Sequence, residues 1–280
     1  MAAGMKLLPV LFAAALVLCC GCVLAFEPAT VPGDPPLNVQ WQPAAQSGRR
    51  PAIIALHGCS GLYNTRGKFD DRYTSYADRW SAAGWHVVAP DSFGSRGQGA
   101  ICAQPAAQRT IKVAHRRDDV LRTAAWLAAR GDVDPQRIAV VGWSHGAMTA
   151  LEVLDRSRWP QVTPAAIVTY YPACSGWKKR ALVQPAAPLL MLLGEADDWT
   201  PAAPCRELAE RFEARFPGAV TARAYADSHH GFDSRSSVCF RADIPGGVEA
   251  RGVHVGGNPA AREASLLELD RFLAQHLRQK

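Results

Sequence analysis

Residues 142–146 of the chain read Gly-Trp-Ser-His-Gly and place Ser144 between two glycines. This G-x-S-x-G spacing is typical of a nucleophilic serine on a tight turn between a strand and a helix, where glycines relieve crowding of the backbone. The apolar run at 137–141 predicts a buried strand, and residues 147–154 predict a helix. Because the pentapeptide also arises by chance, a working serine requires a base, an acid and an oxyanion hole elsewhere.

Short apolar segments alternate with helical segments along the rest of the chain. We expect strands at 51–56, 85–90, 137–141, 165–171, 188–193 and 220–225, with an edge strand at 37–41. We expect helices at 72–83, 108–130, 204–216 and 259–277, and a turn at 134–137. Strands that are apolar throughout and separated by helices indicate an α/β fold with a mostly parallel sheet and helices on both faces.

Polar segments follow three of the expected strands, at 57–61, 194–201 and 226–232. The first is glycine-rich, the second contains Asp197 and Asp198, and the third contains His229 and His230. In an open parallel sheet, ligands bind beyond the carboxyl ends of the strands, so these segments should meet near the serine. Their order along the chain, Ser, Asp, His, is the order of one hydrolase fold.

Four segments together resemble the dienelactone hydrolase family, which has the α/β-hydrolase fold. They are HGCSG (57–61), DPQRIAVVGWSHGAM (134–148), GEADDWTP (194–201) and HHGFD (229–233). They occur in the family's order and span nearly all of the chain after residue 25. Dienelactone hydrolases proper carry cysteine where this chain has Ser144, so the resemblance implies serine-esterase chemistry rather than the dienelactone substrate itself.

The resemblance assigns the partners of Ser144. His230 directly precedes a Gly-Phe pair as in the family and is the expected general base, with His229 as the alternative. Asp197 matches the family's acid, with Asp198 as the alternative. In this chemistry the histidine takes the serine proton, while the carboxylate holds the imidazole tautomer and stabilises the imidazolium.

An oxyanion hole needs two backbone N–H groups that converge on one point. We expect these groups to come from His145, directly after the serine, and from Cys59, in the loop at 57–61. Three aromatic residues close to the motifs, Trp143, Trp199 and Tyr63, are expected to bind substrate.

The amino-terminal residues predict a secretory signal peptide over 1–25. One positive charge, Lys6, precedes an apolar run at 7–18, and the segment ends in Val-Leu-Ala. A lipid-modified Cys22 is the alternative, although the expected leucine does not precede it. The remaining residues, 26–280, fit one α/β-hydrolase domain, and no other stretch is expected to cross a bilayer. We therefore expect a secreted or periplasmic protein, with anchoring at the membrane surface as the alternative.

The cysteines after residue 25 predict two disulfides and one free thiol, since exported proteins retain disulfides. We expect the pairs Cys59–Cys102 and Cys174–Cys205, because the members of each pair follow elements that end at the same edge of the sheet, and we expect Cys239 to be free. After residue 25 the chain has no CxxC and no HExxH motif, so we expect neither a metal nor another cofactor. The net charge of +6 is scattered, which argues against a nucleic-acid-binding surface.

The favoured function is a secreted hydrolase of small carboxylic esters or lactones that forms a serine acyl-enzyme. A peptidase of the same fold is an alternative, although the chain has no room for the additional gating domain that such enzymes often carry. A catalytically silent binding protein is a third interpretation, which the complete set of Ser, His and Asp disfavours. The sequence leaves the acyl and alcohol groups and the oligomeric state open.

Overall fold

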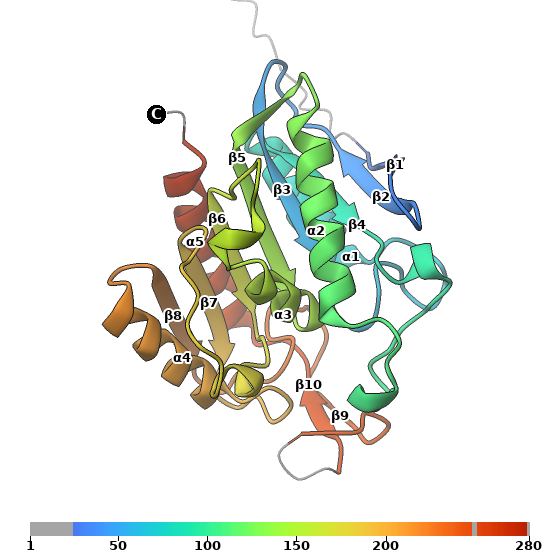
Figure 1. Cartoon of the computed structure of the whole chain (residues 1–280). Helices are drawn as coiled ribbons and strands as arrows, with labels where there is room; N and C mark the ends of the chain where they lie inside the picture. The colour runs from blue at the N-terminus through green and yellow to red at the C-terminus, as the bar shows by residue number, and fades with distance from the viewer. Residues whose placement is uncertain (1–24, 248–250, 279–280) are drawn as a thin grey trace, which may run out of the picture.

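Eight strands form one sheet through the middle of the molecule, in the order β1-β2-β4-β3-β5-β6-β7-β8 (Figure 1). The structure is a computed structural model that describes residues 25–247 and 251–278. The strands are β1 Glu27–Val31, β2 Leu37–Gln42, β3 Arg50–Leu56, β4 His86–Pro90, β5 Val133–Trp143, β6 Ala166–Tyr170, β7 Leu189–Gly194 and β8 Val220–Tyr225. All pairs from β4 through β8 are parallel, while β1 with β2 and β2 with β4 are antiparallel. The expected α/β fold with a mostly parallel sheet is therefore confirmed.

Helices cover both faces of the sheet (Figure 1). They are α1 Asp71–Ala82, α2 Val113–Ala128, α3 His145–Glu152, α4 Ala202–Arg215 and α5 Pro259–His276, with short 3-10 turns at Gly94–Arg96, Ala106–Gln108, Arg156–Arg158 and Ser175–Trp177. Buried residues of α2, α3 and α4 join one core cluster and those of α1 and α5 the other. Along β3, Ile54 and Leu56 belong to the first cluster and Ile53 to the second. This alternation explains why the central strands are apolar at every position.

The expected edge strand at 37–41 lies one place inside the sheet. Strand β1 pairs antiparallel with it, from Glu27 opposite Trp41 to Val31 opposite Leu37. Strand β1 was not expected, because most of its residues are exposed and Pro28 interrupts the pattern. Proline is tolerated at an edge, where one side of the strand needs no partner.

Two further boundaries differ from expectation. Helix α2 begins at Val113 rather than at residue 108, and Ala106–Gln108 forms a separate 3-10 turn. The expected turn at 134–137 lies inside β5 as an irregularity, because the pairing with β3 shifts between Arg50 and Ala52. The carboxylate of Asp134 accepts a hydrogen bond from the backbone N–H two residues later, which gives this bulge the local geometry of a turn.

A small hairpin not expected from the sequence lies beyond the carboxyl ends of the parallel strands, at the bottom of Figure 1. It pairs β9 Cys239–Arg241 with β10 Val253–Val255. Its strands are three residues long, too short to produce a hydropathy pattern. Val255 forms a β-bridge with His230, and the N–H of Gly256 donates to the carbonyl of His230 at 2.9 Å. The hairpin is thus attached to the segment that carries the expected base.

Both expected disulfides are present. Cys59 is bonded to Cys102 and Cys174 to Cys205, with Cα atoms 5.0 Å apart in each pair, while Cys239 is free and exposed. Among the described residues, no helix has the length and apolar character needed to cross a membrane. Residues 1–24 of the expected signal peptide lie outside the described part of the chain.

Candidate active site

Ser144 lies at a sharp elbow between β5 and α3. Its φ of +52° falls in the left-handed region, which is strained for a residue with a side chain. A Cβ atom on Gly142 would lie 2.3 Å from the carbonyl oxygen of Gly146, and one on Gly146 would lie 2.1 Å from that of Leu56. Both glycines of the motif are therefore required by the close approach of β5, α3 and β3.

The structure brings Ser144, His230 and Asp197 into one hydrogen-bonded chain. His230 Nε2 lies 2.9 Å from Ser144 Oγ, and His230 Nδ1 lies 2.9 Å from Asp197 Oδ2. Because a carboxylate only accepts, Nδ1 carries the imidazole proton, and Nε2 is left to accept from the serine. The alternatives lie elsewhere, since Asp198 contacts His254 and His229 stands beside that pair.

The carboxylate of Asp197 is buried, so its charge requires hydrogen bonds in place of water. The N–H groups of Trp199 and Thr200 donate to Oδ1 at 2.9 and 2.8 Å, and the Thr200 hydroxyl donates to Oδ2 at 2.9 Å. Thr200 was not among the residues expected at the site. Its signal in the sequence is its position three residues after Asp197, because a short acceptor side chain in a loop commonly accepts from the N–H groups two and three residues later.

The backbone N–H groups of Cys59 and His145 lie on either side of the elbow. Neither donates a hydrogen bond to another protein group within residues 25–247 and 251–278. His145 is the first residue of α3, where the N–H has no partner inside the helix. Cys59 follows Gly58, whose Cα faces the serine closely enough that a Cβ there would be 3.6 Å from Ser144 Cβ. Two free donors therefore border the serine.

The loop that carries Cys59 is held from several directions. Gly58 donates to the hydroxyl of Tyr73 at 3.0 Å, and Ile101 donates to the carbonyl of Cys59 at 2.8 Å. The disulfide to Cys102 fixes the Cys59 side chain as well. The Gly58 N–H and the Cys59 carbonyl are thus hydrogen-bonded within the fold, while the Cys59 N–H is left free.

A buried arginine, Arg116 of α2, lies behind this loop and the elbow. It donates to His145 Nδ1 at 2.8 Å and to the carbonyl of His57 at 2.7 Å. Burial lowers the pKa of Arg116 to about 10. Burial, reinforced by the nearby guanidinium, holds the pKa of both His57 and His145 well below the usual range, so both rings are neutral. Arg116 was missed, although it lies three residues after Val113 on the buried stripe of the helix.

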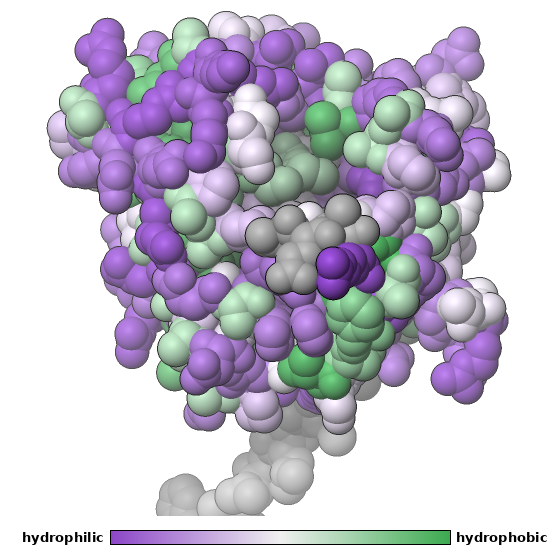
Figure 2. Space-filling model, turned by 90° about the horizontal axis from the view of Figure 1, so that it is seen from below, coloured by the Kyte–Doolittle hydropathy of each residue, from purple (hydrophilic) through white to green (hydrophobic). Residues whose placement is uncertain are grey.

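A cavity of about 790 Å³ opens beside the serine, and its lining includes Cys59, Ser144, Trp199 and His230. Figure 2 looks onto this end of the molecule, where the surface is largely hydrophilic with scattered apolar residues. The indole of Trp199 lies 4.5 Å from the His230 ring, centroid to centroid, at the mouth of the site. This arrangement is compatible with the expected contact of Trp199 with substrate.

The other two aromatic residues expected to bind substrate have different roles. Trp143 borders the cavity, but its side chain is completely buried and its Nε1 donates to Asp233 at 3.0 Å, so substrate cannot reach the indole. Tyr63 is not part of the cavity lining, and its hydroxyl accepts from Gln40 at 2.8 Å. Both assignments are corrected: an aromatic residue beside a motif belongs as readily to the core as to the pocket.

Asp233, at the end of the HHGFD segment, is a second buried charge that sequence analysis missed. It accepts hydrogen bonds from Trp143, from Tyr76 at 3.0 Å and from Tyr171 at 2.7 Å, and the guanidinium of Arg72 lies 3.6 Å away. These donors compensate for the desolvation of the carboxylate. They also tie the segment after His230 to α1 and to the elbow strand.

The sheet, the serine elbow and the histidine that follows the last parallel strand define an α/β-hydrolase. The sequence model of the dienelactone hydrolase family matches residues 39–277, and the chain belongs to this family. It is therefore a hydrolase that acts on esters or lactones.

Solved structures share this fold at low sequence identity. The chain resembles the dienelactone hydrolase-like promiscuous phosphotriesterase P91 from metagenomic libraries (19% identity, TM-score 0.66, 91% of this chain and 100% of that one). It also resembles esterase 2 of Thermogutta terrifontis, solved after phosphorylation by paraoxon. The identity is 18% and the TM-score 0.62, and the match covers 92% of this chain and 97% of that one. Dipeptidyl peptidase 4 of Porphyromonas gingivalis matches with a TM-score of 0.62 and 17% identity over 91% of this chain but only 36% of its own.

The neutral histidines behind the elbow predict a specific loss of stability in acid. The pKa of His57 and of His145 is lower in the folded chain than the ordinary value of 6.5, so below pH 6.5 the unfolded chain binds more protons. Stability is intact above this pH and falls below it, by up to about 1.4 kcal/mol per pH unit for each ring. Urea unfolding of the wild type and of His145→Asn between about pH 5 and 8 measures this slope. The variant should have the shallower slope, and equal slopes would contradict the assignment.

Proposed function

We propose that the protein is an exported serine hydrolase that cleaves carboxylic esters or lactones through an acyl-enzyme on Ser144. The observation that carries the proposal is the continuous hydrogen-bonded chain from Ser144 through His230 to Asp197, beside the free N–H groups of Cys59 and His145. The strained serine supports it further, because backbone strain persists where function requires it and argues against a silent scaffold.

Acylation begins when Ser144 Oγ attacks the ester carbonyl and His230 Nε2 accepts the hydroxyl proton. The carbonyl oxygen becomes an oxyanion, which the N–H groups of Cys59 and His145 stabilise. Asp197 stabilises the imidazolium and keeps its Nδ1 proton in place. When the intermediate collapses, the carbon–oxygen bond to the alcohol breaks and His230 gives its proton to the departing alkoxide.

Deacylation repeats these steps with water as the nucleophile. His230 takes a proton from water, the hydroxide adds to the acyl carbonyl, and collapse restores Ser144 with the same proton. In a lactone the alcohol released in the first step remains covalently attached to the acyl group. The product is then a single hydroxy acid, formed by the same residues.

Substitutions separate the members of this triad from their neighbours. Ser144→Ala and His230→Ala should each lower kcat for a p-nitrophenyl ester by on the order of 10⁴- to 10⁶-fold, and Asp197→Asn by about 10⁴-fold. Steady-state kinetics measure the loss of activity. Melting temperatures are measured for the same variants and should stay close to that of the wild type, because the substitutions should leave the fold intact. His229→Ala and Asp198→Asn are matched controls that should keep most activity. Wild-type turnover by Ser144→Ala, or a larger loss at His229 than at His230, would overturn the assignment.

A peptidase is the second candidate, favoured by the likeness to a dipeptidyl peptidase. The chain spans only about a third of that protein's length, and at 17% identity the likeness shows a shared fold and not a shared substrate. A panel of p-nitrophenyl esters, lactones and aminoacyl p-nitroanilides distinguishes the two functions. We expect kcat/KM for the best ester or lactone to exceed that of any anilide by at least about 100-fold, the equivalent of some 2.7 kcal/mol. Anilides cleaved as fast as esters would favour the peptidase.

We also propose that residues 1–25 direct export and that residues 26–280 act as one hydrolase domain. The two disulfides support an oxidising compartment, because cytosolic thiols are kept reduced. Expressed at full length in a bacterial host, the protein should be recovered from the periplasm or medium with Phe26 as its first residue. Amino-terminal sequencing and fractionation measure this outcome. An amino terminus at a lipid-modified Cys22 would contradict cleavage after Ala25 and would show that the protein is anchored to the membrane.

A further inference from the structure

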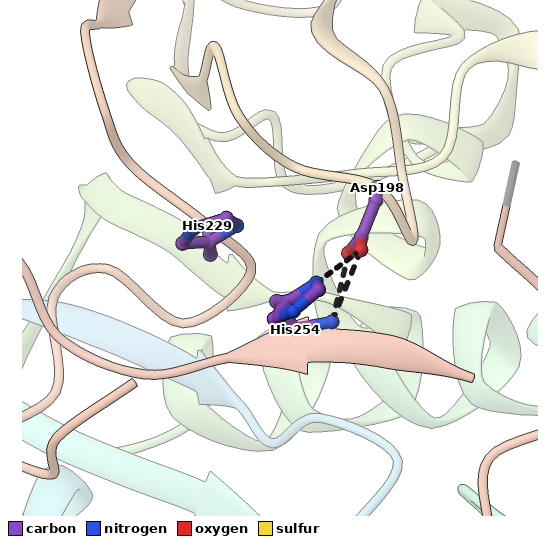
Figure 3. A group of neighbouring side chains, drawn as sticks. All are labelled: Asp198, His229 and His254. Atoms are coloured by element: carbon purple, nitrogen blue, oxygen red, sulfur yellow. Dashed lines mark hydrogen bonds and ion pairs between the residues drawn. The ribbon is translucent and has the colours of Figure 1, made fainter. Parts of the chain in front are cut away.

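Asp198, His229 and His254 form a cluster of side chains that the proposed reaction does not use (Figure 3). One potential ligand atom from each residue lies within 4.8 Å of the other two. Asp198 follows β7, His229 follows β8 and His254 lies on β10, so three separate segments converge here. Within the ranges 25–247 and 251–278, it is the one group of three such residues at this spacing.

The carboxylate of Asp198 is held firmly against β10. It accepts from the backbone N–H of His254 at 2.9 Å and from the imidazole Nδ1 of the same residue at 2.7 Å. The dashed lines in Figure 3 show these bonds, and the ring of His229 lies beside them with none. The two imidazole rings are 5.2 Å apart, centroid to centroid. The cluster therefore already has a fixed carboxylate and two neighbouring imidazoles.

His229 supplies an independent indication that a ligand belongs here. Its Nδ1 is buried from solvent and has no hydrogen-bond partner among residues 25–247 and 251–278. A buried polar atom without a partner costs about 1–3 kcal/mol, and such atoms are rare in folded proteins. A cation beside the two other ligands would satisfy an imidazole nitrogen that the protein leaves unpaired.

We propose that Asp198, His229 and His254 bind one divalent transition-metal ion, best matched by Zn²⁺. Two imidazoles and a carboxylate with water in the fourth position are an established zinc ligand set. In a tetrahedral site with bonds of about 2.0–2.1 Å, ligand atoms are roughly 3.3 Å apart, so small side-chain rotations close the cluster around the ion. The side chains of Asp198 and His254 are 32% and 44% exposed, which gives an ion access from solvent.

The ion would connect the loops of the triad from their outer side. Asp198 is adjacent to Asp197 and His229 is adjacent to His230, while His254 precedes the residue that bridges to His230. An ion held by all three would link the acid loop, the base loop and the β9–β10 hairpin without touching Ser144. Its role is therefore to brace these segments, and the chemistry of ester cleavage stays with the serine.

Calorimetric titration of the chelator-treated exported protein, which begins at Phe26, with ZnCl₂ tests the proposal. We expect one ion per chain with a Kd of about 1 µM or tighter, and Zn²⁺ at about 100 times Kd should raise the melting temperature by roughly 5 °C. His254→Ala and Asp198→Asn should each weaken binding at least about 100-fold. Far-UV circular dichroism and the melting temperatures of the metal-free variants show that they are folded.

Two matched controls exclude binding elsewhere on the surface. Cys239→Ser removes the free thiol of the neighbouring strand, and His115→Ala removes an exposed imidazole of α2. Both should bind Zn²⁺ as the wild type does. No binding by the wild type, equal binding by His254→Ala, or loss of binding in Cys239→Ser would each overturn the site. None of these measurements depends on the proposed hydrolase reaction, so the two proposals can fail separately.

Discussion

Three backbone segments are in close contact at the elbow, and this contact fixes where the serine and the loops around it can lie. Strand β5 reaches Ser144 while the first turn of α3 packs against the end of β3, and only glycine fits at 142 and 146. The contact forces the serine into a left-handed conformation that an isolated peptide would avoid. The assembled sheet holds the serine in this conformation, and the long apolar runs of β3, β5 and β6 provide the burial that offsets the strain.

Two buried charges of opposite sign extend this constraint to the loops around the serine. Arg116 holds the segment that carries Cys59 on one side, and Asp233 holds the segment that follows His230 on the other. Each side chain has several hydrogen-bond partners. Arg116 donates to a carbonyl and an imidazole, and Asp233 accepts from phenol and indole groups. A buried charge with several fixed partners tolerates few alternative geometries, so these residues specify loop position as much as they stabilise the fold.

The apolar strands, the helices between them and the order of the motifs could be predicted from the sequence because each depends on local pattern. Strands β1, β9 and β10 could not. The residues of β1 and β9 are largely exposed, β10 has only three residues, and the pairing of all three strands is set by tertiary contacts. The motif predicted a reactive position for Ser144, but it could not tell that the adjacent Trp143 points into the core. Side-chain direction alternates along a strand, and only the packed sheet shows which face of β5 lies toward α1.

The adjacent pairs Asp197–Asp198 and His229–His230 show most clearly why a site cannot be reduced to residue types. Within each pair the chemistry is identical, so sequence alone leaves two candidates for each role. The surroundings distinguish them: Asp197 faces two N–H groups, a hydroxyl and His230, whereas Asp198 faces the N–H and ring of His254. Adjacent side chains of a loop leave the backbone in different directions, so one loop can serve the serine with one side chain and a second cluster with the next. Asp198 and His229, the alternatives for the catalytic acid and base, therefore have a different role. Because each is adjacent to a member of the triad, each is suited to hold the same loop on the side away from the serine.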